Sequence, residues 1–240
     1  MRSITKLFLL GLLLTGSAWA DMLFVDMNDS PSEVIEARKE ARRRGENLVV
    51  IPDGDTTAPL EDTLRTTLFA QVMAGKTFSS LILSGEYANQ KYFGTRKGQK
   101  LEITFARLSA LLRAPQFHTI RSGVQTVLLW GCYTARPRAI ADLKNLLPNT
   151  KLLAGFNFAA PPSTALSSPR ILRNVLRLAQ DHIKDRALIS KVQNFVNFTE
   201  GKEDPYNYFA NTNLVVVTRG CYLSSKIGAL RESDLVECPA

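Results

Sequence analysis

Apolar residues form short, nearly continuous runs along this chain, and stretches with helical spacing separate them. The runs that predict strands are Met22 to Met27, Asn47 to Pro52, Ser79 to Gly85, Val124 to Trp130, Leu152 to Phe156 and Asn213 to Thr218. A run without polar alternation is typical of a strand that is buried on both faces, as in a parallel sheet. Strands that alternate with helices therefore predict an α/β protein, with a mostly parallel sheet covered by helices on both sides.

The stretches between these runs predict the helices. Ser30-Pro31-Ser32-Glu33 has the pattern of a capping box, and the helix that it starts ends at Gly45. The charged positions Glu36, Lys39, Glu40 and 42–44 predict a solvated face on this helix. Later helical faces are marked by Leu60, Leu64, Leu68 and Val72, by Leu101, Phe105, Leu108 and Leu112, by Ile140, Leu143 and Leu147, and by residues 170–183 and 188–196. Residues 86–100 and 157–168 are predicted as loops.

Residues 1–20 have the pattern of a secretory signal peptide. Arg2 and Lys6 precede an apolar core from Leu7 to Leu14, and 18–20 form a small-x-small cleavage site. We therefore expect an exported protein, periplasmic or secreted, in which residues 21–240 form a single domain. No later run is long and apolar enough to predict a transmembrane segment.

The net charge and the motifs exclude some partners. The chain has 30 Lys and Arg against 22 Asp and Glu, a formal charge of +8, which favours anionic surfaces and also serves ordinary solubility. A nucleic-acid partner is not expected. Gly75-Lys76-Thr77 ends a predicted helix, and Ala70 stands where a phosphate loop needs Gly, so nucleotide binding is not expected either. No His, Cys or acidic residues of the sequence have the spacing that is typical of metal ligands. We therefore expect no zinc site and no cofactor.

The three cysteines are Cys132, Cys221 and Cys238. Export places them in an oxidising compartment, and an odd number leaves one thiol unpaired. Cys221 and Cys238 both lie near the carboxyl terminus, whereas Cys132 follows a core strand. The economical prediction is a Cys221–Cys238 disulfide with Cys132 free.

Two apolar runs end in glycine beside a chemically active residue. Ser84-Gly85-Glu86 closes one run, and Trp130-Gly131-Cys132 closes the next. In an open parallel sheet, functional groups lie just past the carboxyl ends of the strands. A thiol at this place is either a nucleophile or a small buried side chain, and the residues alone leave both interpretations open.

This arrangement resembles the caspase-like cysteine peptidases of clan CD, the group of the clostripain and gingipain relatives. The resemblance covers residues 79–134 in detail and most of the remaining chain in element order. It implies a three-layer α-β-α sandwich with a six-stranded sheet in the order 2-1-3-4-5-6, the last strand antiparallel. It also implies that Cys132 is the nucleophile and that Glu86 stands where the relatives carry their catalytic histidine.

A glutamate in that position changes the expected function. A carboxylate beside a thiol disfavours the thiolate, and it does not protonate a leaving amine at neutral pH unless burial raises its pKa. His118 precedes the strand that leads to Cys132, on the order of 20 Å away, and His182 is expected on the packed side of its helix.

We therefore predict a degenerate cysteine peptidase, a pseudoenzyme that binds a peptide or a cell-envelope partner. The alternative is an active endopeptidase that uses Cys132 with an unorthodox base. A redox sensor built on Cys132 is a third class, disfavoured because no resolving cysteine is adjacent.

Polar residues at the other strand exits complete the predicted site. Asp26, Asn28, Asp53 and Asn157 follow three further strands, and Gly85 and Gly131 flank the central pair, so all are expected around one crevice. The resemblance implies that the exit of the first strand lines a specificity pocket, where Asp26 suits a basic side chain. Turn and cap chemistry also explains Asp and Asn at such positions.

Overall fold

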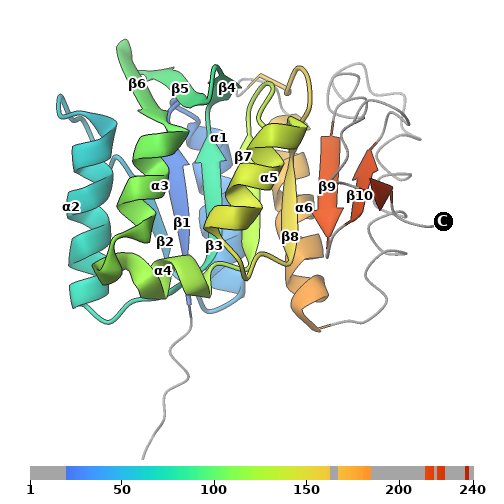
Figure 1. Ribbon diagram of the computed structural model, residues 1–240, viewed down its shortest axis with the longest axis horizontal. Helices are drawn as coiled ribbons and strands as arrows, with labels where there is room; N and C mark the ends of the chain where they lie inside the picture. Colours follow the sequence, from blue (N-terminus) through green and yellow to red (C-terminus); the bar gives the residue numbers. More distant parts are fainter. Residues whose placement is uncertain (1–19, 163–166, 185–213, 219–220, 225–235, 238–240) are drawn as a thin grey trace, which may run out of the picture.

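The computed structural model describes residues 20–162, 167–184, 214–218, 221–224 and 236–237. Its main sheet has the strand order β2-β1-β3-β7-β8-β9-β10-β11 (Figure 1). The strands are β1 (Asp21–Asp26), β2 (Leu48–Ile51), β3 (Phe78–Ser84), β7 (Thr126–Trp130), β8 (Leu152–Phe156), β9 (Leu214–Thr218), β10 (Cys221–Ser224) and β11 (Val236–Glu237). The strands from β2 to β8 pair in parallel, and β9 pairs antiparallel with β8. The predicted α/β class with a mostly parallel sheet is confirmed.

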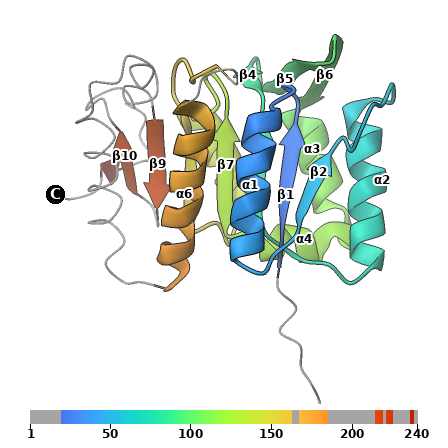
Figure 2. The ribbon, with the colours of Figure 1, turned by 180° about the vertical axis from the view of Figure 1, so that it is seen from behind.

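Helices lie on both faces of this sheet, as Figures 1 and 2 show from opposite sides. One face carries α2 (Leu60–Met73), α3 (Phe105–Arg113), the short 3-10 helix η1 (Pro115–Phe117), α4 (His118–Gly123) and α5 (Pro137–Leu146). The opposite face carries α1 (Pro31–Arg43) and α6 (Ser167–Lys184). The chain therefore buries the sheet between two apolar layers.

Alternating side chains of each strand serve the two layers. In β7, Val127 and Leu129 pack with the first layer, while Leu128 and Trp130 pack with the second. Because both faces of each strand are covered, the strands show continuous apolar runs and no polar alternation. This double burial is the physical reason that the strands were predictable from the sequence.

The predicted solvated face of α1 is partly wrong. Glu40 and Arg44 are 2% and 5% exposed, because α6 packs over this side of α1. Arg177 Nε lies 3.3 Å from Glu40 Oε2, and the Arg44 guanidinium donates to the backbone carbonyl of Leu176. The buried charges of Glu40 and Arg44 are tolerated because Glu40 forms an ion pair and the Arg44 guanidinium has a carbonyl acceptor.

Residues 86–104, predicted as a loop followed by the start of a helix, instead form a second sheet. Its antiparallel strands are β4 (Glu86–Ala88), β5 (Lys91–Arg96) and β6 (Gln99–Thr104), and Leu101 therefore belongs to β6. Figure 1 shows this sheet above the carboxyl ends of β1 and β3. Tyr87 and Tyr92 anchor it to the core, with ring centroids 4.9 Å apart.

Within the described part of the chain, no helix has the length and apolar character needed to cross a membrane. Residues 1–19 of the expected signal peptide, the predicted helix 188–196 and Cys238 lie outside the described residues. Cys221 begins β10, and its predicted disulfide with Cys238 stays a prediction.

Candidate functional site

Two neighbouring strands bring the glycine-containing exits together. β3 and β7 pair in parallel with Ser84 opposite Trp130, and Gly85 N–H donates to the Trp130 carbonyl at 3.0 Å. A Cβ atom on Gly131 would lie 2.0 Å from the Gly85 carbonyl oxygen, so the two backbones approach too closely for a side chain. Gly131 is therefore required by the close packing of the two exits.

Cys132 follows β7 as a partly exposed free thiol. Ala160 N–H donates to its Sγ at 3.4 Å, and Tyr87 N–H donates to its carbonyl oxygen at 3.0 Å. The next residue, Tyr133, has a φ of 61°, a left-handed conformation that is uncommon without glycine. The Tyr133 ring packs edge-on against Phe158, with the centroids 5.1 Å apart. Strained residues of this kind cluster at functional sites, where the surrounding structure holds them.

Cys132 opens onto a pocket of about 420 Å³, which we call the Cys132 pocket. Strand exits, the face of β5 and the loop before α6 all contribute to it. Its lining residues are Asn28, Ser30, Glu33, Ser84, Glu86, Phe93, Gly94, Thr95, Trp130, Gly131, Cys132 and 160–162. Four predicted site residues, Asn28, Glu86, Gly131 and Cys132, thus line one pocket, and Glu86 is exposed at its rim.

The buried floor of the Cys132 pocket is formed by Ser30, Glu33 and Ser84, each at most 1% exposed. The indole N–H of Trp130 donates to Glu33 Oε1 at 3.1 Å, and the Ser168 hydroxyl donates to the same oxygen. Ser30 Oγ and Ser84 Oγ are hydrogen-bonded to each other at 3.2 Å. The floor is therefore a connected polar network beneath apolar walls.

Burial raises the pKa of the Glu33 carboxyl above its ordinary value, although the hydroxyls of Ser168 and Ser30 and the indole of Trp130 favour the charged form. Its second oxygen, Oε2, has no hydrogen-bond partner among the described residues. A buried carboxylate oxygen without a hydrogen-bond partner is unusual, since buried polar groups are nearly always satisfied.

The capping box predicted for Ser30 and Glu33 is wrong. The Ser30 hydroxyl makes no cap hydrogen bond and contacts Ser84, while Glu33 binds two residues that are 97 and 135 positions away. Sequence reasoning therefore missed Glu33 as a site residue. One signal was present, because Glu33 stands four positions before Ala37 on the face of α1 that is buried.

Asp26 occupies a different place from the one expected. It is 2% exposed and does not line the Cys132 pocket in the described structure. Its carboxylate accepts from the backbone N–H groups of Asn28 and Ser30, and Arg96 Nε lies 3.4 Å from Oδ2. Burial raises the pKa of Asp26, and the Ser30 N–H and Arg96 oppose this shift. The negative charge expected for a basic ligand is already paired within the chain.

The remaining predicted residues do not line the pocket either. Gly85 is buried behind it, where a Cβ atom would lie 2.6 Å from Met27 Cε. Asp53 is exposed on the loop after β2, and Asn157 follows β8 with a buried side-chain oxygen that has no described partner. These strand exits share one edge of the sheet but do not meet in one cavity.

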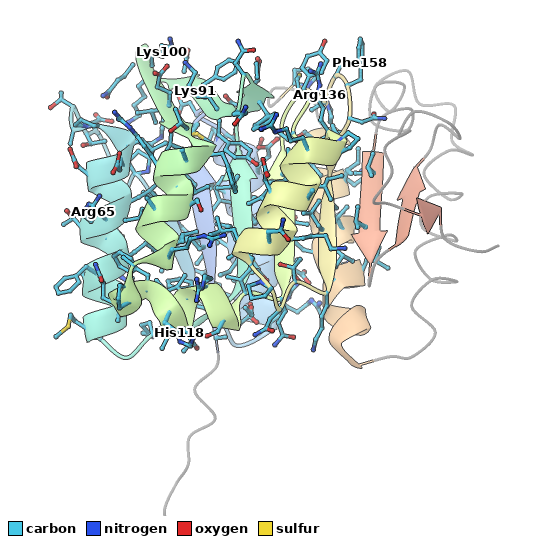
Figure 3. The ribbon with its side chains drawn as sticks, viewed as in Figure 1. Arg65, Lys91, Lys100, His118, Arg136 and Phe158 are labelled. Carbon is cyan, nitrogen blue, oxygen red and sulfur yellow. The ribbon has the colours of Figure 1, made fainter. Side chains whose placement is uncertain are left out.

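The two histidines were expected to lie away from Cys132. Exposed His118 begins α4 at the end of the molecule opposite Arg136 and Phe158, as Figure 3 shows. His182 lies in α6, and its side chain is outside the described structure. The described residues contain no cluster of His, Cys, Asp and Glu suited to a metal ion.

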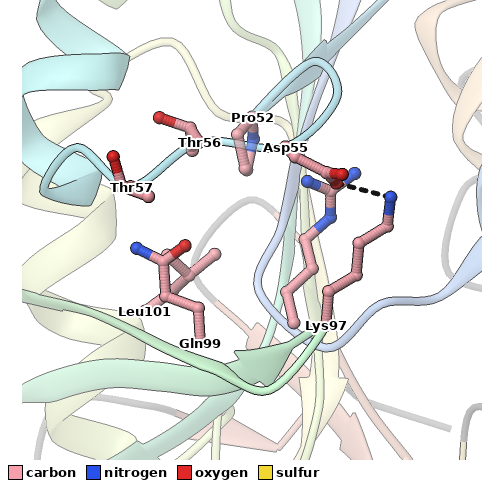
Figure 4. Close-up of a pocket in the computed structure, with 8 residues that line it drawn as sticks. Pro52, Asp55, Thr56, Thr57, Lys97, Gln99 and Leu101 are labelled. Carbon is pink, nitrogen blue, oxygen red and sulfur yellow. Dashed lines mark hydrogen bonds and ion pairs between the residues drawn. The ribbon is translucent and has the colours of Figure 1, made fainter.

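A second pocket, of about 380 Å³, lies between the loop after β2 and the hairpin that joins β5 to β6 (Figure 4). Arg96 and Lys97 line it together with Asp55, which binds the Lys97 ammonium at 2.5 Å. Its charges are thus largely paired, and Cys132 is not among its lining residues.

The sequence matches no protein-family model and no curated protein. The function must therefore be argued from the site.

Proposed function

We propose that this chain is an exported caspase-like domain that binds a peptide or an envelope protein through the Cys132 pocket and does not cleave it efficiently. The pocket receives a basic side chain of the partner. The fold supports this proposal through its neighbouring strands β3 and β7, which carry Glu86 and Cys132 just beyond their carboxyl ends. Ligand sites of open α/β sheets lie at this edge.

One observation carries the proposal, namely the charge of the pocket. Two carboxylates, Glu33 and Glu86, line it, and its described lining contains no Lys, Arg or His. A cationic side chain compensates this charge, while Trp130 and Phe93 give apolar walls for the aliphatic part of the same side chain. Glu33 thereby takes the role that the sequence assigned to Asp26.

The same lining argues against efficient peptide hydrolysis. Activation of a cysteine nucleophile requires a neighbouring base, and histidine serves because its pKa lies near neutrality. Glu86 occupies the rim as an exposed carboxylate and offers no comparable proton transfer.

The test is a library of fluorescently labelled peptides that differ at one position, scored for binding by polarisation and for cleavage by mass spectrometry. We expect peptides with Lys or Arg to bind at least about tenfold more tightly than norleucine peptides, a difference of ~1.4 kcal/mol. We expect no cleavage above that of a Cys132→Ala variant. Equal binding of norleucine peptides would contradict the proposed ligand class.

An active cysteine endopeptidase is the second candidate. It is favoured by the free Sγ of Cys132, which lines the pocket and accepts the Ala160 N–H. Cleavage that disappears in Cys132→Ala would support this candidate over the binding protein.

The substitution Glu86→His provides a further test of the site. An imidazolium near a thiol favours the thiolate, so we expect faster alkylation of Cys132 by iodoacetamide at pH 7 than in the natural chain. An unchanged rate would show that residue 86 does not face the sulfur. Glu102→His, on β6, is the matched control, because Glu102 is exposed on the same small sheet and does not line the pocket.

A further inference from the structure

We propose that the outer face of α1 and α6 docks the protein onto a lipid bilayer that carries anionic headgroups. The two helices cover the same side of the sheet and pack side by side, as Figure 2 shows. Six basic side chains on this helix pair form what we call the basic face. They are Lys39, Arg42 and Arg43 of α1 and Arg170, Arg173 and Arg177 of α6. In the described structure none of them lines the Cys132 pocket, so this inference goes beyond the proposed function.

The helical spacing of these residues directs them away from the sheet. On each helix, spacings of three and four positions place the basic side chains on one side. The other side packs into the apolar layer beneath, through Ala37 and Ala41 of α1 and through Leu172 and Val175 of α6. All six cations are exposed or partly exposed. They therefore gather on the outer surface of one helix pair.

Negative charge is scarce on the basic face. Two carboxylates, Glu36 and Glu40, lie between the helices, and each pairs with a cation from α1 and a cation from α6. Their side chains are only 14% and 2% exposed, so a partner meets mainly the cations. Glu33, the other acid of α1, lines the Cys132 pocket instead. A face that served solubility alone would intersperse both signs of charge at its surface.

Two cations of the basic face are available to a partner. Arg42 and Arg170 are exposed, and neither forms an ion pair with another residue in the part of the chain that the structure describes. A guanidinium group can bind two oxygens of one phosphate group, whereas an ammonium group acts as a point charge. Because five of the six cations are arginines, the basic face suits a surface of phosphate groups.

An exposed apolar side chain favours a bilayer over a soluble polyanion. Ile35 is 52% exposed and stands four and seven positions before Lys39 and Arg42, so it shares their side of α1. At a bilayer, this side chain can enter the boundary between headgroups and acyl chains, where burial of apolar area adds to the attraction between cations and anionic lipids. The charged backbone of a soluble polyanion offers it no such environment.

The experiment measures sedimentation of the full chain, expressed for export, with vesicles of equal parts phosphatidylglycerol and phosphatidylcholine. One basic residue near an anionic bilayer contributes about fivefold in affinity, so Arg42→Gln combined with Arg170→Gln should weaken binding at least about tenfold. The matched control combines Arg113→Gln of α3 with Arg138→Gln of α5, two exposed positions on the opposite face. It removes the same charge and should change binding by less than about twofold.

Ile35→Ser distinguishes a bilayer from a soluble polyanion, for which heparin is the probe. We expect this variant to bind the vesicles several-fold more weakly and to bind heparin as the natural chain does. The matched control is Met73→Ser on α2, where the natural side chain is 71% exposed, and it should change neither affinity.

Three results would overturn the proposal. Equal losses in the two double variants would show that the net charge acts and not the basic face. Phosphatidylcholine vesicles that bind as tightly as the mixed vesicles would exclude a role for anionic headgroups, as would binding that does not weaken when added salt screens the charges. An unchanged vesicle affinity of Ile35→Ser would exclude the bilayer and leave a soluble polyanion as the partner. Peptide binding by the Cys132 pocket is tested separately, because the pocket and the basic face share no residue.

Discussion

Replacing Gly131 by alanine tests the close approach of β3 and β7 on which the whole site depends. The added Cβ would lie 2.0 Å from the Gly85 carbonyl oxygen, whereas ordinary contacts begin at 3.4 Å. Both atoms belong to or adjoin the backbone, so the two strand exits must separate by about 1.4 Å. No rotation of a flexible side chain relieves this contact.

The expected loss of stability follows from the contacts that such a separation breaks. The hydrogen bonds from Gly85 N–H to Trp130 O and from Tyr87 N–H to Cys132 O are both 3.0 Å long and connect the two exits. Two such bonds contribute ~2 kcal/mol, and overpacking adds ~1–3 kcal/mol. We therefore expect Gly131→Ala to lower the free energy of unfolding by about 3–5 kcal/mol.

Urea unfolding followed by circular dichroism measures this difference. Gly54→Ala is the control, because Gly54 has a φ of +77° and a Cβ atom added there would meet no atom within 4 Å. We therefore expect Gly54→Ala to lose only the ~1–2 kcal/mol that a left-handed backbone conformation costs a residue with a Cβ atom. If Gly131→Ala loses less than about 1 kcal/mol, or no more than Gly54→Ala, the two exits are not in contact and the Cys132 pocket is wrong.

Three further predictions concern buried polar groups. Burial raises the pKa of Glu33 above 4.5, so its stabilising contribution is complete below that pH and is lost as the pH rises through the folded-state pKa. Glu33→Gln should therefore raise the free energy of unfolding at pH 8, with a smaller gain near pH 4 in urea titrations, and a gain independent of pH would contradict this. Thr134→Val removes a hydroxyl that donates to two backbone carbonyls at 2.7 Å and should lose ~1–3 kcal/mol in the same assay, whereas Thr134→Ser should lose less. Arg96→Met leaves the Asp26 carboxylate buried without its ion pair and should lose ~3 kcal/mol at pH 7, whereas Lys97→Met, at an exposed pair, should change thermal stability by under ~1 kcal/mol.

Six strands of the main sheet were predictable from their apolar runs, whereas β10 and β11, which extend the sheet beyond the six predicted strands, were not. All five residues of β7 and all five of β8 are buried, so their apolar runs are unbroken and end where the burial ends. Residues at the exits of β3 and β7, Glu86 and Cys132, then had to lie near each other once the two strands were neighbours. The proximity of Glu86 and Cys132 therefore follows from the pairing of β3 with β7 alone.

The second sheet was not predictable from local pattern. Its strands have three to six residues and contain Lys, Arg and Gly94, which do not favour strands. Their stability comes from long-range packing of Tyr87 and Tyr92 into the core. Because the second sheet was not predicted, its Arg96 was not expected near Asp26. The sequence analysis therefore assigned Asp26 to ligand binding, whereas its carboxylate pairs with Arg96 of β5.

Glu33 shows how a local sequence rule can conceal a residue that lines the candidate site. Its distance of three positions from Ser30 fits a capping box, and only the folded chain brings Trp130 and Ser168 to its carboxylate. A buried carboxylate with a raised pKa weakens the folded state at neutral pH, and a neutral glutamine retains an acceptor for the same donors. If Glu33 contributes the negative charge of the Cys132 pocket, Glu33→Gln should therefore stabilise the protein and also weaken the binding of basic peptides. A residue that lowers the stability of the fold but contributes to binding is expected at a functional site, because such sites often carry residues that are unfavourable for folding. If Glu33→Gln lowered both stability and binding at pH 8, the carboxylate would be a structural element and its contribution to binding would be indirect.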